Sequence, residues 1–317
     1  MTEFIKFIDE KSLGNYKENV SFKILTTYKT GGNARVVFYP NDVNCLKEAL
    51  KFLKKNNISF KVFGNGSNIL ASDDDYNGVI IKLTNLNKMK FEDGKIEVEA
   101  GYNFALLANT VTKKGYSGLD FACGIPASVG GAVYMNAGAY LSDVSKVLDK
   151  VTFLDDDYEI KTLTKKDLDY SYRHSIFMIH NWIILKAYFT LKKDDVERMI
   201  ELINDRKQRR IESQPLEFPS AGSVFRNPEG MYAGKLIEDC NLRGYVHGGG
   251  EISSKHANFI VNKGNATSSD IKYLMDLAKS EVSKKYDIEL HREQELFNFG
   301  DNVWVRKKEK RNLEFFY

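Results

Sequence analysis

The sequence predicts an α+β protein of two or three domains, in which short helices are interspersed among many strands. The chain has 317 residues, whereas a single domain has roughly 150. Apolar residues recur at helical spacing in a few segments, and the other apolar runs are short and rich in β-branched or aromatic residues. Glycines form two groups, from Gly14 to Gly138 and from Gly222 onward, with none at 139–221. Two loop-rich regions should therefore flank a continuously folded stretch.

The first part of the chain predicts two helices separated by strands. Four apolar residues from Val43 to Leu53 are spaced as on one helix face, which places a helix over 41–57 with Asn41 or Asp42 as its cap. Gly115 should end a second helix over 105–114. Strands are expected at 60–63, 79–83 and 96–100.

The later part of the chain predicts two more strands, two longer helices and a linker. Strands are expected at 151–154 and at 182–191, which is aromatic and β-branched. Helices are expected over 194–213 and 268–284, and a last strand should begin at 288–290. Pro215 and Pro219 mark the linker between domains.

Composition excludes several classes of protein. The formal net charge is +3, of which the basic tail at 301–317 contributes +2, so the body has no footprint for nucleic acid. Three cysteines without a C-x-x-C pair, no signal peptide and no apolar run of ~18 residues indicate a cytoplasmic protein that is not bound to a membrane. The sequence has no G-x-G-x-x-G, Walker A or G-x-S-x-G motif, and its histidines lack metal-ligand spacing.

Four segments combine glycine with small or polar residues. They are TTYKTGGNA at 26–34, GNGSNIL at 64–70, GIPASVGGAVYMNAGA at 124–139 and SAGSVFRNP at 220–228. Successive backbone N–H groups in such loops can form concave sites for phosphate oxygens. Each loop taken alone could simply be a turn, but the segment at 124–139 is too long and too apolar for that interpretation.

In this combination the segments resemble the UDP-N-acetylenolpyruvoylglucosamine reductase family. That family shows NTF-x-x-GG-x-A, G-x-GSN-x-L, GIPG-[TS]-x-GGA-x-x-NAGA and AGS-x-F-[KR]-NP, and all four have counterparts here in the same order. Three further elements match Y-R-x-S at 172–175, K-H-x-N-F at 255–259 and L-x-x-E at 290–293. The resemblance extends from about Asn19 to Gly300.

The resemblance implies an FAD-binding domain of the vanillyl-alcohol-oxidase (PCMH) type over 1–197, in two lobes divided near residue 85. A smaller α+β substrate domain would occupy 198–300, followed by the tail at 301–317. The FAD pyrophosphate would lie on the loop at 64–68, and the ribityl and ring portions along 124–138. The implied FAD-binding residues are Tyr28, Gly64, Asn65, Gly66, Ser67, Asn68, Gly124, Ile125, Pro126, Ser128, Gly130, Gly131, Asn136, Ala137 and Gly138.

The resemblance also implies a reaction and its catalytic residues. NADPH would reduce FAD, and UDP-N-acetylglucosamine enolpyruvate would then be reduced to UDP-N-acetylmuramate for peptidoglycan, with hydride passing from flavin N5 to C3. Ser223 matches the family's proton donor to C2, Arg173 the arginine that faces the substrate carboxylate, and Glu293 the late acidic residue. The implied substrate-binding residues are Arg173, Tyr172, Arg226 and Asn227.

The sequence leaves the late carboxylate and the exact function open. Counting forward from Leu290 favours Glu293 as the late carboxylate, whereas counting back from Gly300 gives Glu295. Only 49 residues separate Arg173 from Ser223, so the chain is expected to belong to the short subclass without a tyrosine-bearing insertion, and to be a monomer. Two alternatives are an FAD-linked oxidase or dehydrogenase of a small hydroxy acid, and a sugar-nucleotide-binding module without catalysis.

Overall fold

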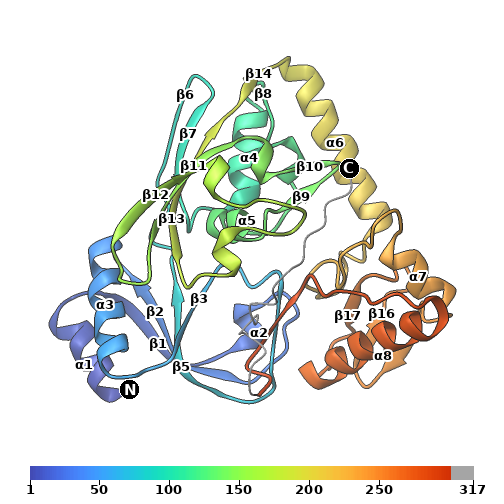
Figure 1. Cartoon of the computed structure of the whole chain (residues 1–317), viewed down its shortest axis with the longest axis horizontal. Coiled ribbons are helices and arrows are strands. Elements are labelled where there is room, and N and C mark those ends of the chain that lie inside the picture. Colours follow the sequence, from blue (N-terminus) through green and yellow to red (C-terminus); the bar gives the residue numbers. More distant parts are fainter. Residues whose placement is uncertain (301–317) are drawn as a thin grey trace.

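Two larger β-sheets and a smaller mixed unit make up residues 1–300, the part of the chain that the computed structural model describes (Figure 1). This arrangement confirms the α+β class. The basic tail expected at 301–317 lies outside the described residues. Within residues 1–300, no helix is long and apolar enough to cross a membrane.

The first sheet is built from the N-terminal part of the chain and has four strands in the order β1-β2-β5-β3. These strands are β1 (Gly14–Ser21), β2 (Asn33–Pro40), β3 (Phe60–Phe63) and β5 (Tyr76–Lys82). β1 and β2 are antiparallel, whereas β5 runs parallel to both β2 and β3. Helices α1 (Thr2–Glu10) and α3 (Val43–Lys55) cover one face of this sheet (Figure 1). The Asp42 side chain caps α3 by accepting from the Cys45 N–H.

The second sheet has five antiparallel strands in the order β12-β11-β13-β7-β6. They are β6 (Met89–Glu92), β7 (Lys95–Glu99), β11 (Leu148–Leu154), β12 (Ile160–Thr164) and β13 (Ile183–Thr190). Helices α4 (Phe104–Thr112) and α5 (Val129–Tyr134) come from the chain between β7 and β11, and α5 packs on β7 and β13. This packing brings the glycine-rich stretch around α5 onto the face of a rigid sheet.

Helix α6 (Val196–Ser213) runs from the second sheet down to the C-terminal unit (Figure 1). It contacts α4 and the short turn η1 (Asp120–Ala122), and Arg206 forms an ion pair with Asp120. The expected domain start at residue 198 falls inside this helix, which contacts the first unit and, through the Lys255 ammonium at the Ile211 carbonyl oxygen, also the C-terminal unit.

The C-terminal unit has its own hydrophobic core. Its elements are α7 (Ala233–Asp239), β15 (Val246–His247), β16 (Gly250–Ile252), β17 (Ile260–Asn262) and α8 (Ser268–Tyr286). Thr267 and Asp270 form a capping box that starts α8. Leu274, Met275 and Ala278 are buried along the face of α8 that the helical spacing predicts.

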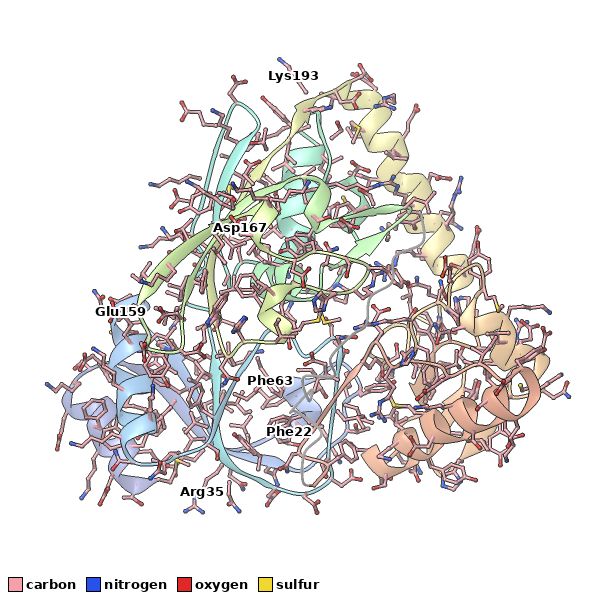
Figure 2. All side chains as sticks on the ribbon, in the orientation of Figure 1. Phe22, Arg35, Phe63, Glu159, Asp167 and Lys193 are labelled. Atoms are coloured by element: carbon pink, nitrogen blue, oxygen red, sulfur yellow. The ribbon has the colours of Figure 1, made fainter. Side chains whose placement is uncertain are left out.

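The last strand returns the chain to the N-terminal part of the fold. The prediction that it begins at 288–290 is wrong, because the strand is β18 (Glu295–Phe297), which pairs in parallel with β4 (Ile69–Ala71). Phe297 packs edge-on against Phe22 and Phe63 at 5.5 and 5.0 Å between ring centroids. Phe22 and Phe63 point toward each other below the second sheet (Figure 2). This aromatic contact packs the end of β18 against Phe22 and the end of β3.

Candidate active site

A single large cavity contains most of the residues that the sequence singled out. Its volume is about 1780 Å³, well above the ~300–1,000 Å³ of a typical small-ligand site. Three polar groups of interest lie on its wall, namely Arg173, Ser223 and Glu293. The glycine-rich walls are formed by Gly64, Asn65, Gly66, Ser67, Asn68, Ile125, Pro126, Ser128, Gly130, Gly131, Ala137 and Gly138.

The loop at 64–68 follows β3 and lies close to backbone on one side. Gly66 has a φ of 67°, and a Cβ there would lie 2.1 Å from the Leu25 carbonyl oxygen, so only glycine fits. Beneath the loop, the Lys82 ammonium donates to the Gly64 carbonyl oxygen. Burial lowers the pKa of Lys82 to about 8. The loop therefore combines backbone N–H groups with a nearby buried amine.

The segment at 124–138, which includes α5, approaches this loop closely. Ser128 caps α5 by accepting from the Gly131 N–H at 3.2 Å. A Cβ on Gly64 would lie 2.7 Å from Ser128 Oγ, and Asn65 Nδ2 donates to the Pro126 carbonyl oxygen at 3.3 Å. The two glycine-rich loops thus form adjacent walls, close enough to hold one extended ligand between them.

Arg173 lies at the tip of a tight turn that this same segment anchors. The turn is closed by backbone hydrogen bonds between Ser171 and His174, and Asn136 Nδ2 donates to the Ser171 carbonyl oxygen at 2.9 Å. Arg173 has a φ of 54°, a conformation that non-glycine residues adopt only where surrounding contacts impose it. The guanidinium is therefore held at a defined place on the cavity wall.

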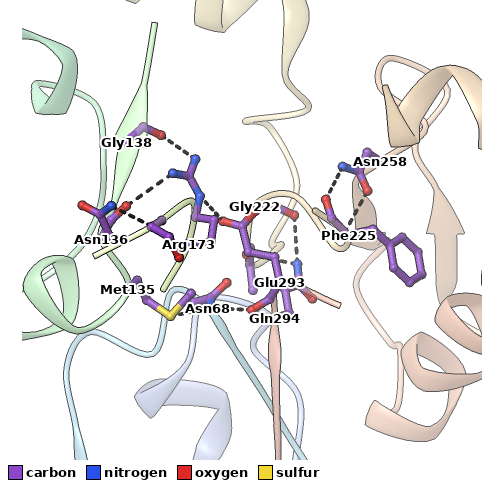
Figure 3. A network of polar contacts seen from close by, with 12 residues as sticks. Asn68, Met135, Asn136, Gly138, Arg173, Gly222, Phe225, Asn258, Glu293 and Gln294 are labelled. Atoms are coloured by element: carbon purple, nitrogen blue, oxygen red, sulfur yellow. Dashed lines mark hydrogen bonds and ion pairs between the residues drawn. The ribbon is translucent and has the colours of Figure 1, made fainter. Parts of the chain in front are cut away.

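Three contacts orient the Arg173 guanidinium (Figure 3). Nε donates to Glu293 Oε1 at 2.8 Å, Nη2 to the Gly138 carbonyl oxygen at 2.7 Å and Nη1 to the Asn136 carbonyl oxygen at 3.4 Å. The Arg173 and Glu293 side chains are only 17% and 16% exposed. Burial raises the pKa of Glu293, and the charges of Arg173 and Arg226 oppose that rise.

These contacts distinguish the two candidate carboxylates. Both Glu293 and Glu295 line the cavity, but Glu293 is the one that forms the ion pair with Arg173. Glu295 lies in β18, and its charge acts on Lys61. Burial lowers the pKa of Lys61, and the charge of Glu295 opposes part of that shift. The structure therefore places Glu293, rather than Glu295, beside the arginine.

Ser223 lies where the main cavity meets a second, smaller one. The second cavity has a volume of about 330 Å³. Its wall includes Ser223 and Asn227, together with Tyr232, Lys235, Glu238, Arg243, Lys255 and His256. A ligand that passes Ser223 could thus extend from the glycine-rich walls into a pocket that contains three cationic side chains.

Six of the expected site residues do not line the main cavity. Tyr28 is fully buried and donates its hydroxyl to Gln294 Oε1 at 2.8 Å. The Gly124 carbonyl oxygen accepts from Arg210, which itself lines the cavity, and Asn136 contributes its carbonyl oxygen to Arg173. The Tyr172 ring lies 5.0 Å from the Arg173 guanidinium carbon.

The other two of the six lie beyond Ser223. Asn227 Oδ1 accepts from the Ala233 N–H at the start of α7, and Asn227 lines the smaller cavity. The Arg226 charge acts on Glu293. The role of Tyr28 in FAD binding stays a prediction, and within the described residues its hydroxyl bonds Gln294.

Two polar residues near the cavity carried no sequence signal. Lys82 reaches the loop at 64–68 from β5, and Gln294 bonds the backbone just before Ser223. Neither belongs to a motif, because each depends on a contact between segments distant in the chain.

Comparisons with known families match separate parts of the chain. A family model described as "FAD binding domain" matches residues 34–164. A second, "UDP-N-acetylenolpyruvoylglucosamine reductase, C-terminal domain", matches residues 214–297. The first match, together with the glycine-rich cavity, defines the class of the protein as an FAD-binding oxidoreductase.

Full-length relatives define the family. The UDP-N-acetylenolpyruvoylglucosamine reductase of Clostridium novyi (strain NT) is 43% identical over 277 residues, which are 87% of this chain and 90% of the relative. That of Bacillus subtilis (strain 168) is 40% identical over 93% of this chain and 98% of the relative. The crystal structure of the Thermus caldophilus reductase has a TM-score of 0.76 at 31% identity and covers 89% of this chain and 100% of that one. The chain belongs to the UDP-N-acetylenolpyruvoylglucosamine reductase family.

Membership of this family confirms the resemblance, the fold class and the FAD cofactor. The protein is an oxidoreductase of peptidoglycan synthesis that acts on a UDP-sugar and has FAD as its cofactor. The close approach of Gly64 to Ser128 and the left-handed Gly66 leave no room for a Cβ at either position, so this part of the cavity wall consists largely of backbone, which suits the phosphates of FAD.

Proposed function

We propose that the protein reduces UDP-N-acetylglucosamine enolpyruvate to UDP-N-acetylmuramate, with Ser223 as the proton donor to C2 of the enolpyruvyl group. The observation that carries this proposal is the convergence of Ser223, Arg173 and Glu293, from three distant segments, on one cavity with glycine-rich walls. When bound, FAD supplies the hydride, which passes from its N5 to C3 of the substrate after NADPH has reduced the flavin.

The two glycine-rich walls would hold the cofactor. Backbone N–H groups at 64–68 suit the pyrophosphate, because they neutralise oxygens without bulky side chains. The segment at 124–138, with Ser128 at the start of α5, suits the ribityl and ring portions. The Lys82 ammonium under Gly64 adds a positive charge on the pyrophosphate side.

Arg173 would face the substrate carboxylate and stabilise the charge that develops during hydride transfer. Within residues 1–300, its three hydrogen bonds use three of the five guanidinium N–H donors, which leaves two for the substrate. Because the guanidinium is already oriented, it needs no reorganisation as the charge grows on the carboxylate side. Glu293 acts through Arg173, by holding the fork in its orientation.

Ser223 would complete the reaction by protonating C2. Serine is a weak acid, so it must act through its position and through neighbouring charge. Its position on the wall of both cavities supports this role, because a substrate whose enolpyruvyl end lies at Arg173 would share the larger cavity with it.

The smaller cavity would receive the UDP portion of the same substrate. Lys235, Arg243 and Lys255 supply cationic groups there, each beside a carboxylate (Asp239, Glu238 and Glu217), and Tyr232 supplies an aromatic ring. Asn227 lies on the same wall. We further propose that the enzyme acts as a monomer in the cytoplasm, where the free state of Cys45, Cys123 and Cys240 is stable.

The test is an anaerobic two-step assay on the purified full chain. The protein should be yellow, NADPH should bleach the flavin, and UDP-N-acetylglucosamine enolpyruvate should restore the oxidised spectrum. The product should be two hydrogen atoms heavier than the substrate. UDP-N-acetylglucosamine, which lacks the enolpyruvyl group, should leave the flavin reduced.

Other outcomes would support the alternative functions. A colourless, folded protein would indicate a sugar-nucleotide-binding module. A yellow protein that NADPH does not reduce, but that a small hydroxy acid does, would indicate an oxidase or dehydrogenase.

A further inference from the structure

Gln294 connects Tyr28 to the backbone just before Ser223 through buried hydrogen bonds. The residue follows Glu293 directly and is only 3% exposed. Its Nε2 donates to the carbonyl oxygens of Ala221 at 3.0 Å and Gly222 at 2.9 Å. Its Oε1 accepts from the Tyr28 hydroxyl at 2.8 Å. The carboxamide thus uses both N–H donors and an acceptor position within the protein interior.

We propose that Gln294 is a positioning residue that holds the Ala221–Gly222 backbone so that the Ser223 hydroxyl stays at the reacting end of the substrate. This inference rests on the proposed function, because it takes Ser223 as the proton donor. Gln294 lies in none of the sequence motifs, and Tyr28 takes part through its hydrogen bond to Gln294.

The backbone on the other side of Ser223 is held by a second carboxamide (Figure 3). Asn258 Oδ1 accepts from the Phe225 N–H at 3.0 Å, and Asn258 Nδ2 donates to the Phe225 carbonyl oxygen at 2.9 Å. The Val224 N–H donates to the Asn258 carbonyl oxygen at 2.8 Å. Ser223 therefore lies between two fixed points, with Gln294 holding the residues before it and Asn258 those after it.

The side held by Gln294 has the greater conformational freedom. Gly222 has a φ of 75°, and no atom lies within 4 Å of where its Cβ would be. Within residues 1–300, open space therefore lies on that side of the peptide, and no contact there holds it. A glycine peptide has many accessible conformations, and the two donors of Gln294 restrict it to one. Without them, the hydroxyl of the next residue is free to move relative to the substrate.

Three partners hold the Gln294 carboxamide in one orientation. The carbonyl oxygens of Ala221 and Gly222 only accept, so they require Nε2 to face them. The Tyr28 hydroxyl, whose pKa burial raises far above its ordinary value, stays protonated and donates to Oε1 on the other side. A glutamate at this position would place a carboxylate oxygen against both carbonyls and could not replace the glutamine.

The position of Gln294 in the chain joins two parts of the proposed machinery. Glu293 orients Arg173, and the adjacent Gln294 orients the backbone before Ser223. One short segment thus sets the relative placement of the carboxylate-binding cation and the proton donor. Misplacement of a reacting group by about 1 Å can slow a reaction ~10²-fold.

The test measures the two half-reactions separately by anaerobic stopped-flow absorbance on Gln294→Met, which keeps the volume and removes the amide. Flavin reduction by NADPH should stay within about twofold of the wild type, whereas reoxidation by UDP-N-acetylglucosamine enolpyruvate should slow by ~10–100-fold. Reoxidation in the variant should also show a larger solvent deuterium isotope effect, because proton delivery becomes limiting. Gln208→Met, at an exposed glutamine on α6 that bonds Glu212, is the matched control and should change neither step.

A double substitution separates positioning from general damage to the fold. In a Ser223→Ala background, Gln294→Met should cause little further slowing, because there is no hydroxyl left to position. Slowing by the same factor in both backgrounds, or equal slowing of both half-reactions, would overturn the inference. If Gln294→Met does not fold, Tyr28→Phe is the second variant, because it removes only the hydroxyl that bonds Gln294. Tyr28→Phe should slow reoxidation by a smaller factor, ~3–10-fold. Unchanged reoxidation in Tyr28→Phe would overturn the inference.

The design distinguishes failure of the inference from failure of the proposed function. Unchanged reoxidation in Ser223→Ala would overturn both, because Ser223 would then not be the proton donor. Slow reoxidation in Ser223→Ala together with wild-type behaviour of Gln294→Met would overturn the positioning role alone.

Discussion

Replacement of Arg173 by methionine should strongly slow reduction of the substrate while leaving reduction of the flavin nearly intact. The substitution removes the cation proposed to face the substrate carboxylate, from a site where its side chain is 17% exposed. Two unit charges about 4 Å apart interact by ~4 kcal/mol at an effective dielectric constant of ~20. Loss of one preorganised charge-stabilising donor typically costs ~2.7–4 kcal/mol. The two values agree, and they predict ~10²–10³-fold slower flavin reoxidation.

The assay is single-turnover reoxidation of the NADPH-reduced flavin by substrate, followed by its absorbance. Arg173→Lys keeps the charge but loses the fork that reaches Glu293 and the carbonyl oxygens of Asn136 and Gly138 together. It should therefore lie between the wild type and Arg173→Met. The matched control is Arg198→Met at an exposed ion pair with Asp194, which should not change the rate. Reoxidation of Arg173→Met within threefold of the wild type would refute the role of Arg173.

Three further substitutions test the surroundings of the site. Burial lowers the pKa of Lys82 to about 8, so the affinity of the apoprotein for FAD, measured by flavin fluorescence, should fall as the pH rises above about 8. Lys82→Met should bind FAD more weakly at all pH values and should not show that fall. The same dependence of affinity on pH in both proteins would contradict this. Burial raises the pKa of Glu293, so ionisation of this carboxyl destabilises the fold. The difference in Tm between Glu293→Gln and the wild type should therefore grow in favour of the variant from pH 5 to pH 8. A constant difference in Tm would count against a raised pKa. Tyr28→Phe should leave FAD affinity within about twofold, because the hydroxyl bonds Gln294, and a tenfold loss would support Tyr28 as a cofactor contact.

The elements that the sequence predicted well carry local signals of their own. Helices α3, α6 and α8 are capped by the residues that precede them, Asp42, Asp195 and Thr267. Each of these side chains accepts from a backbone N–H of the first turn. Each helix also has a clear apolar spacing. Such information lies within one segment, so it can be found without knowledge of the rest of the fold.

The elements that were missed or misplaced depend on distant partners. The strand β1 has little buried surface, because it lies at the edge of its sheet, and its sequence shows no apolar alternation. The strand expected at 288–290 forms instead at β18, where the parallel partner β4 lies. Strand register is set by pairing, and the pairing partner is more than two hundred residues away in the chain.

The same distinction applies to the site. Short motifs were enough to select Arg173 and Ser223, and the structure brings both to one cavity. Counting along the chain could not choose between Glu293 and Glu295, because that choice depends on which carboxylate reaches Arg173. Gln294 and Lys82 could not be found at all, since each is identified by a buried contact with a remote backbone carbonyl.

In the proposed mechanism, Ser223 delivers the proton in the step that consumes the enolpyruvyl substrate. The most direct measurement compares both half-reactions of Ser223→Ala with those of the wild type in the anaerobic assay. NADPH should reduce the flavin of the variant at nearly the wild-type rate, and UDP-N-acetylglucosamine enolpyruvate should then reoxidise it far more slowly than in the wild type. Equal loss of both half-reactions, or reoxidation at the wild-type rate, would contradict the account.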